Sequence, residues 1–348
     1  MGAMTHDVVG RGSTGGLLLA LLSAGSFGLS GSLATELMAS GWSAGAAVTA
    51  RVTLAAAVLL IPALLALRGR WSLLKPAIGR ILAYGALAVA GCQLAYFLAV
   101  QQMAVGVALL IEYTAPIAVL LWWWLAKGAR PSRMTLIGAA VALIGLILVL
   151  DLTSGSRVNA AGVGWALLAM AGAAAYFVMS SDESHGLPPI VLAAGGLLVG
   201  AVGLGLAGLL GLVPMAASTA SPVYRGMAVP WWLPVAVLGV VTAGIAYVTG
   251  IAAARRLGSR LASFVALSEV LAAVAAAWLL LGQLPAAIQL GGGLLILAGV
   301  VVVKLGEIPE IPETPEAREL SVPPTPPTPP TPPKAPMLAQ LSSRSNAG

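Results

Sequence analysis

The stretch GVALLIEYTAPIAVLLWWW, residues 106–124, decides how the rest of the chain is interpreted. It is apolar over the length of about 20 residues that a membrane-spanning helix needs, yet it contains Glu112 and Pro116. Because proline has no N–H, Pro116 leaves the carbonyl of Glu112, four positions earlier, without its helical hydrogen bond. The stretch therefore predicts a distorted membrane helix that offers a carboxylate and a free carbonyl at one place.

The composition of the whole chain agrees with a membrane environment. Hydrophobic residues make up 59% of the 348 residues and charged residues 9%, whereas soluble domains carry about 25% charged residues. No basic cluster is interleaved with aromatic residues, so we expect no nucleic-acid partner. The single Cys92 excludes an intramolecular disulfide, and we find no metal-ligand, Walker, esterase or dinucleotide-binding motif. We therefore expect a protein that is not an enzyme and needs no cofactor.

Ten apolar segments are long enough to be considered spans. The fold expected from them is an all-α integral membrane protein with ten transmembrane helices. The third and fourth segments, like the ninth and tenth, are separated by a few residues only, which predicts antiparallel helix pairs. The segments cover approximately residues 16–38, 44–67, 80–101, 105–126, 134–151, 160–180, 188–212, 230–254, 259–281 and 285–304.

The distribution of Lys and Arg predicts the orientation of these helices. If the N-terminus is cytoplasmic, 15 of the 18 basic residues fall in inner segments, only Arg157 and Arg225 fall in outer loops, and Arg51 lies within the second span. Cytoplasmic loops of membrane proteins carry an excess of Lys and Arg. We therefore predict a multi-pass protein of the cell (plasma) membrane, the inner membrane of a bacterial cell, with both termini in the cytoplasm.

The two halves of the chain resemble each other. Residues 93–150 and 245–303 both begin near an Ala-Tyr pair, pass through a Trp-containing apolar stretch and close with a Gly-rich helix. Aligning Pro116 with Val270 places Ala115 opposite Glu269. Because each half has five spans, the second half must enter the membrane from the opposite side. Such inverted repeats are typical of alternating-access transporters with a binding site between the halves.

The expected organisation has four parts. A cytoplasmic N-terminal segment, residues 1–15, precedes a first repeat at 16–152 and a second repeat at 160–304. Residues 305–348 contain PPTPPTPPTPP, which favours an extended polyproline II conformation over a packed domain. We expect a solvated cytoplasmic tail, with a docking or phosphorylation segment as the alternative.

The sequence resembles the EamA-type transporters of the drug/metabolite transporter superfamily. The resemblance covers roughly residues 16–304 and rests on ARVTLAAAVLLIPALL, GVALLIEYTAPIAVLLW and LGSRLASFVALSEVLAAVAAAWLLLGQ. The IEYTAP form is similar to the threonine/homoserine exporter branch. Two departures stand out: Glu269-Val270 replaces the Glu-Pro pair of many members, and their Gly-Glu pairs read Ala126-Lys127 and Gly282-Gln283 here. Any coupling role of those missing groups does not transfer.

Charged residues at bilayer depth are the main candidates for a site. A central charge costs about 2.5–3.5 kcal/mol on insertion scales, so it usually faces a cavity or a partner. Arg51 and Glu112 each lie about seven residues into spans that start on the same side, hence at similar depth, roughly 10 Å below the surface. Arg51 could bind a carboxylate and Glu112 an ammonium group; alternatively, the two pair and join two helices. Glu269 is a third candidate.

Other candidates are polar or aromatic residues inside the spans. Each of them also has a packing interpretation, which is the more common role for aromatic residues. A cation–π contact would suit a cationic or aromatic substrate, and Gln could hydrogen-bond it. The further candidates for substrate binding or coupling are Tyr113, Pro116, Gln93, Tyr96, Trp165, Tyr176 and Tyr247.

The function expected from these features is secondary transport of a small polar metabolite through a central cavity, with export of amino acids or related amphiphilic compounds. Proton coupling through Glu112 or Glu269 and facilitated diffusion both stay open. The alternatives are export of drugs or quaternary amines on the same fold, a lipid flippase or membrane enzyme, and a non-transporting scaffold that acts through its Pro-rich tail. The partners expected are a small-molecule substrate and the lipid bilayer; the sequence carries no signal for an oligomeric state.

Overall fold

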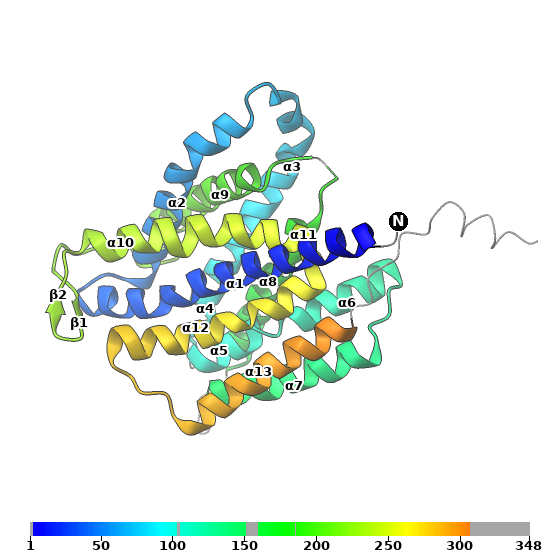
Figure 1. Cartoon of the computed structure of the whole chain (residues 1–348). Coiled ribbons are helices and arrows are strands. Elements are labelled where there is room, and N and C mark those ends of the chain that lie inside the picture. The colour runs from blue at the N-terminus through cyan, green and yellow to red at the C-terminus, as the bar shows by residue number, and fades with distance from the viewer. Residues whose placement is uncertain (1–2, 103–104, 151–158, 185, 307–348) are drawn as a thin grey trace, which may run out of the picture. The chain divides into compact units, whose positions relative to one another are not determined.

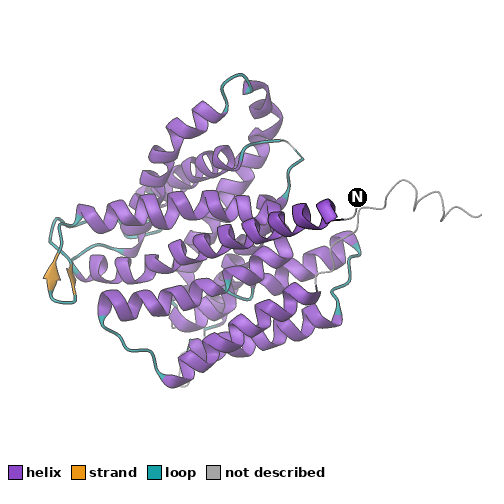
Figure 2. Ribbon diagram, in the orientation of Figure 1, coloured by secondary structure: helices purple, strands orange, loops and turns teal. Residues whose placement is uncertain are grey.

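The computed structural model describes residues 3–102, 105–150, 159–184 and 186–306, and within this part the chain is almost entirely helical (Figures 1 and 2). The predicted Pro-rich tail lies outside the described residues except for its first two positions. In chain order the principal helices are α1 (Ala3–Ala39), α2 (Ala44–Ala66), α3 (Leu74–Tyr84), α4 (Cys92–Val100), α5 (Val105–Glu112), α6 (Ala115–Lys127), α7 (Arg133–Val149), α8 (Ala160–Ser181), α9 (Pro189–Leu209), α10 (Trp232–Gly239), α11 (Ala246–Ala266), α12 (Ser268–Ala276) and α13 (Ala287–Gly306).

Eight helical stretches in the described part are long and apolar enough to cross a membrane. The expected spans 134–151 and 259–281 correspond to two shorter apolar helices, Arg133–Val149 and Ser268–Leu281. The predicted gap between the eighth and ninth spans does not end the helix in the structure. Helical structure continues to Ala266 and is interrupted only at Gly258, which has φ 77° and ψ 160°. A glycine reaches this backbone conformation without a Cβ penalty.

Three expected spans contain a π-helical segment. These are η2 (Gly85–Gly91), η3 (Val240–Ile245) and η4 (Ala277–Leu281). The first two precede the two Ala-Tyr pairs that the repeat comparison aligned, at Tyr96 and Tyr247. Single π-helical turns inside α-helices are frequent at functional sites, since they release a backbone carbonyl from the regular ladder. These segments were not predicted from the sequence.

The two halves interlock through their first helices. Helix α1 packs against α11 and α12 of the second half, and α8 packs against α4, α5 and α6 of the first half. Helix α2 packs against α9. In Figure 1, α1 accordingly lies between α11 and α12. Each half therefore completes its core with helices from the other half.

Helices α7 and α13 form the closest helix pair in the fold, and glycines permit it (Figure 1). A Cβ added to Gly145 would lie 2.6 Å from the carbonyl oxygen of Gly292, and a Cβ on Gly292 would lie 2.7 Å from that of Gly145. Gly138 and Gly299 meet in the same way, each 2.7 Å from the other's carbonyl. The sequence shift that aligns Gly138 with Gly292 and Gly145 with Gly299 is the one that aligns Pro116 with Val270. Small residues of this kind let membrane helices approach closely.

Replacing Gly292 with leucine is expected to lower the thermal stability of the protein strongly, because backbone atoms of α7 cannot move aside as a flexible side chain would. Overpacking of this kind costs about 1–3 kcal/mol or more. The neighbouring Gly291 is exposed and has open space around its Cβ position. Gly291→Leu should therefore unfold near the wild-type temperature. Equal melting temperatures for the two variants in detergent would contradict the packing described.

A short β-hairpin between α9 and α10 was not expected from the sequence. Strands β1 (Val223–Tyr224) and β2 (Met227–Ala228) pair antiparallel. Arg225 and Gly226 form the turn, both with positive φ, as a tight hairpin requires. The Tyr224 hydroxyl donates a hydrogen bond of 2.8 Å to the carbonyl of Leu33, which fastens the hairpin to α1.

Candidate functional site

A cavity of about 640 Å³ lies between the two halves of the fold. Its walls come from α1, α2, α4, α5, α6, α8, α10, α11 and α12, together with η2. It extends to the connection between α1 and α2, where its lining residues Thr35 and Met38 are exposed. A transported molecule could therefore reach the interior from this end.

The predicted distortion at Pro116 is confirmed. Helix α5 ends at Glu112 and α6 begins at Ala115. Between them the Thr114 hydroxyl and N–H both donate to the carbonyl of Ile111, at 2.6 and 3.1 Å, and the N–H of Ile117 donates to Thr114. The backbone hydrogen bonds seen around this break do not use the carbonyls of Glu112 or Tyr113. The residues at this break, including the carboxylate of Glu112, line the cavity.

A second break lies at the equivalent place in the other half. Helix α11 ends at Ala266 and α12 begins at Ser268, the residue that aligns with Thr114. The Ser268 hydroxyl donates 2.7 Å to the carbonyl of Val265, three residues earlier, as Thr114 does to Ile111. No proline marks this break, so the sequence did not predict it. The signal that could have found it is the hydroxyl residue at the aligned position.

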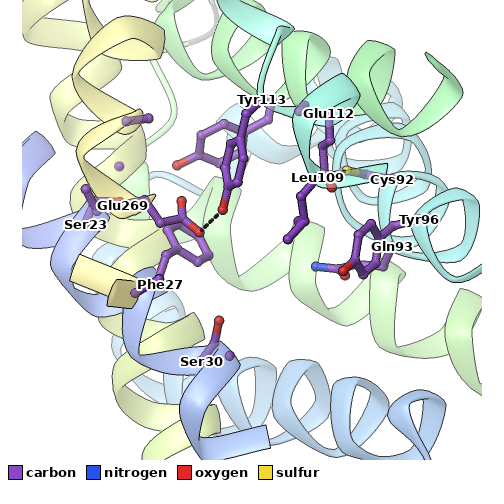
Figure 3. Close-up of a pocket in the computed structure, with 18 of the residues that line it drawn as sticks. Ser23, Phe27, Ser30, Cys92, Gln93, Tyr96, Leu109, Glu112, Tyr113 and Glu269 are labelled. Atoms are coloured by element: carbon purple, nitrogen blue, oxygen red, sulfur yellow. Dashed lines mark hydrogen bonds between the residues drawn. The ribbon is translucent and has the colours of Figure 1, made fainter. Parts of the chain in front are cut away.

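The two breaks meet across the cavity. The Tyr113 hydroxyl, from the first break, donates a hydrogen bond of 3.2 Å to the carboxylate of Glu269, from the first turn of α12 (Figure 3). A carboxylate in the first turn of a helix is stabilised by the positive end of the helix dipole. Glu269 thus has two groups that favour its charged form, and it connects the halves of the chain.

Arg51 is buried on α2 with part of its guanidinium free. Nη2 donates 2.7 Å to the carbonyl of Thr242 in η3, and the group lies 5.5 Å from the centre of the Phe27 ring. Nε has no hydrogen-bond partner in the described part of the chain. Arg51 and Glu269 interact electrostatically without direct contact. The alternative that Arg51 pairs directly with Glu112 is not what the structure shows, because η3 supplies the partner instead.

Glu112 faces a different environment. The Cys92 thiol lies 3.5 Å from its Oε1, and also 3.4 Å from the carbonyl of Ala169 (Figure 3 for Glu112 and Cys92). Among the described residues no cation forms an ion pair with Glu112. Its position at the C-terminal end of α5 puts it near the negative end of a helix dipole. The Cys92 thiol is therefore a hydrogen-bond donor to this carboxylate.

Aromatic rings form one side of the cavity. The rings of Tyr247 and Phe27 meet edge to face at 5.2 Å, and those of Tyr176 and Tyr247 at 5.6 Å. The buried Tyr176 hydroxyl has no hydrogen-bond partner among described residues. It lies over Gly250, where a Cβ would be 2.0 Å away. Sequence reasoning missed Phe27 because a lone phenylalanine in an apolar helix gives no signal.

Nine of the ten residues singled out from the sequence line this one cavity. Besides the residues described above, Gln93, Tyr96 and Pro116 are among them, and Figure 3 shows Gln93 and Tyr96 on the same side as Glu112. Trp165 is the exception. It is half-buried against Ala99, Ala108 and Ala166, because α8 turns that face toward α4 and α5. Trp165 therefore does not line this cavity.

A polar contact between α6 and α11 involves residues that do not line the cavity. The Trp123 indole N–H donates 2.7 Å to the hydroxyl of Ser259, and the guanidinium of Arg260 lies 5.3 Å from the Trp123 ring centre. This contact joins α6 to α11. Arg80, on α3, forms an ion pair of 2.7 Å with Asp182, the residue that follows α8. Partial burial acts to raise the pKa of Asp182. Hydrogen bonds from Ser184 and from the Arg80 guanidinium outweigh this effect and hold the pKa of Asp182 below its usual value.

Comparison with known proteins identifies the family. The model of the EamA-like transporter family matches residues 14–151 and again residues 160–305. The chain belongs to the EamA-like transporter family. Its general function is therefore the transport of small molecules across a membrane. Its apolar helices cross that membrane several times.

A solved structure places the EamA-like chain in a known fold. The match, described only as "Crystal structure of protein", has 21% sequence identity and a TM-score of 0.68 and covers 90% of this chain and 99% of the other. At this identity the likeness shows the fold alone. No protein of curated function matches the chain.

Proposed function

We propose that this protein is a secondary transporter whose substrate is a zwitterionic amino acid or a related amphiphilic metabolite. The observation that supports the proposal best is the charge arrangement of the cavity: one guanidinium with an unused Nε, and two carboxylates from the opposing helix breaks. A guanidinium binds a carboxylate through parallel hydrogen bonds. Arg51 then takes the substrate carboxylate, and Glu269 or Glu112 takes its ammonium group.

The proposed transport mechanism is alternating access by ten helices in two inverted repeats. Two features support it: α1 and α8 exchange their packing partners between the halves, and the glycine contacts of α7 and α13 repeat with the same shift as the helix breaks. The cavity reaches the α1–α2 connection. With both termini cytoplasmic, as the basic loops predict, this state opens outward.

Proton coupling is proposed through Glu112 rather than Glu269. Among the described residues, Glu269 accepts a hydrogen bond from the Tyr113 hydroxyl, lies in the first turn of a helix and shares the cavity with Arg51, whereas Glu112 has the Cys92 thiol as its donor and lies at a helix C-terminus. A buried charge without a partner is costly, and uptake of a proton removes that cost. Glu112 is therefore the carboxyl expected to exchange a proton during the transport cycle.

The first test is counterflow of labelled amino acids in proteoliposomes that contain the full chain. Threonine and homoserine come first, because the IEYTAP form resembles the exporters of those compounds. We expect the internal unlabelled amino acid to drive transient accumulation of the label. Absence of counterflow for every zwitterionic amino acid tried would overturn the substrate class.

A quaternary-amine substrate is the second candidate. It is favoured by the presence of two carboxylates and the ring of Tyr247 in the wall of one cavity, because aromatic faces and carboxylates together bind cations. The two candidates differ in their use of Arg51, which has no role for a substrate that lacks a carboxylate. Counterflow of a tetraalkylammonium ion that survives in Arg51→Met would favour the second candidate.

A further inference from the structure

The lipid-facing surface contains a second hollow, of about 490 Å³, between α6 and α7. Helix α6 turns its packed side toward α8 and α11, whereas α7 packs against α13. The two helices are joined by a short loop but diverge from it, and the space between them is open. The lining residues are Ile117, Leu120, Leu121, Trp124, Leu136 and, with small side chains, Ala139 and Ala140.

The hollow changes from basic to apolar along its length. Arg130 and Pro131 line the end at the loop, and Arg130 is the charged residue among the lining residues. Lys127 and Arg133 flank it, and both are exposed. The stretch LAKGARPSRMT around them contains no Asp or Glu. The loop end therefore presents positive charge with no acidic residue of its own segment to neutralise it.

The hollow is long enough for part of an acyl chain. From Leu136 to Leu143, its first and last lining residues on α7, the helix rises roughly 10 Å at 1.5 Å per residue. This is about a third of the hydrocarbon core, which is about 30 Å thick. Trp124 lies near the loop end, half exposed, where tryptophan prefers the boundary between hydrocarbon and headgroups.

We infer that this hollow is a binding site for one anionic phospholipid. An acyl chain lies against the Leu, Ile and Ala side chains, and the phosphate group accepts hydrogen bonds from the guanidinium of Arg130. A zwitterionic lipid fills the same apolar space but gains less from the basic end. The inference depends on the membrane location of the chain and not on its substrate.

The site also has a link to the central cavity. Helix α6 supplies Ile117 and Leu120 to the hollow and Pro116 to the cavity, within little more than one helical turn. A lipid bound at α6 therefore rests on the same short helix that begins at the break beside Glu112. Occupancy is expected to stabilise α6 in its present position.

The test is native mass spectrometry of the purified full chain with phosphatidylglycerol or phosphatidylcholine of identical acyl chains. One basic residue near the surface contributes about 1 kcal/mol, which corresponds to roughly fivefold in affinity. We expect phosphatidylglycerol to bind about fivefold more tightly than phosphatidylcholine. Arg130→Ala should reduce this preference about fivefold, and Lys75→Ala, which removes an exposed charge from α3, should leave it unchanged.

Two further arms separate the lipid from other occupants. Ala140→Trp fills the hollow without changing charge, and it should weaken binding of both lipids at this site. Soluble glycerol phosphate should not bind measurably, because it lacks the acyl chain. The inference would be overturned if Arg130→Ala kept the preference unchanged or if the two lipids bound with equal affinity. It would also be overturned if glycerol phosphate bound equally well, or if a dimer formed through this face instead.

Discussion

Replacing Arg51 with methionine is expected to weaken amino-acid binding by about thirtyfold or more. Loss of a hydrogen-bonded charge partner from a buried pair costs at least about 2 kcal/mol, and every 1.4 kcal/mol is tenfold. The fold should persist, because methionine has a similar volume and replacing a buried charge by an apolar residue is often tolerated. Binding of a zwitterionic amino acid to the purified protein, measured by calorimetry, checks the expectation.

Two controls make the Arg51 result specific. Arg51→Lys keeps the charge but loses the planar fork, so its affinity should fall between those of wild type and Arg51→Met. Lys75→Met removes an exposed basic residue of α3 and should bind as wild type does. If Arg51→Met bound the amino acid as tightly as wild type, the carboxylate role of Arg51 would be excluded. The second candidate substrate, a quaternary amine, would then gain support.

Replacing Glu112 with glutamine is expected to abolish the effect of a pH gradient on transport. If one proton moves with each substrate, a difference of one pH unit corresponds to about 1.4 kcal/mol, or tenfold accumulation. Glutamine keeps the size of the side chain but cannot exchange a proton. In proteoliposomes, the ratio of substrate accumulation with and without the gradient should therefore fall from about tenfold to about one.

The matched carboxyl variants separate coupling from binding. Glu269→Gln should keep the response to the gradient while weakening affinity, because Glu269 has the Tyr113 hydroxyl and the field of Arg51 to hold its charge. Glu36→Gln changes a residue of α1 that is not part of the cavity wall, and it should behave as wild type. A wild-type flux that ignores the gradient would exclude proton coupling and leave facilitated diffusion.

Particular residues show why some features could be predicted from the sequence. Pro116 lacks an N–H, so the break after Glu112 follows from covalent chemistry alone and appears in the structure at that place. Charged residues in apolar helices are similarly informative, because lipid penalises them wherever they lie. Arg51, Glu112 and Glu269 were found in this way, and they line one cavity.

Other features depend on how helices from distant parts of the sequence meet. The partner of Arg51 is a carbonyl of η3, which became available through a π-helical turn that no residue type announces. Trp165 and Trp123 show the same limit for aromatic residues. Trp165 packs away from the cavity, and Trp123 joins α6 to α11 through Ser259. A tryptophan in an apolar run has the same appearance in both roles.

The sequence by itself determined the membrane class, the repeated halves, the break at Pro116 and the three intramembrane charges, because each follows from local chemistry or from the cost of a charge in lipid. Only the tertiary structure decided which groups face each other. It joined Tyr113 to Glu269, gave Glu112 a thiol neighbour in Cys92 and left part of Arg51 free. Those pairings depend on helix rotation and close approach, which are set by contacts between residues far apart in the chain.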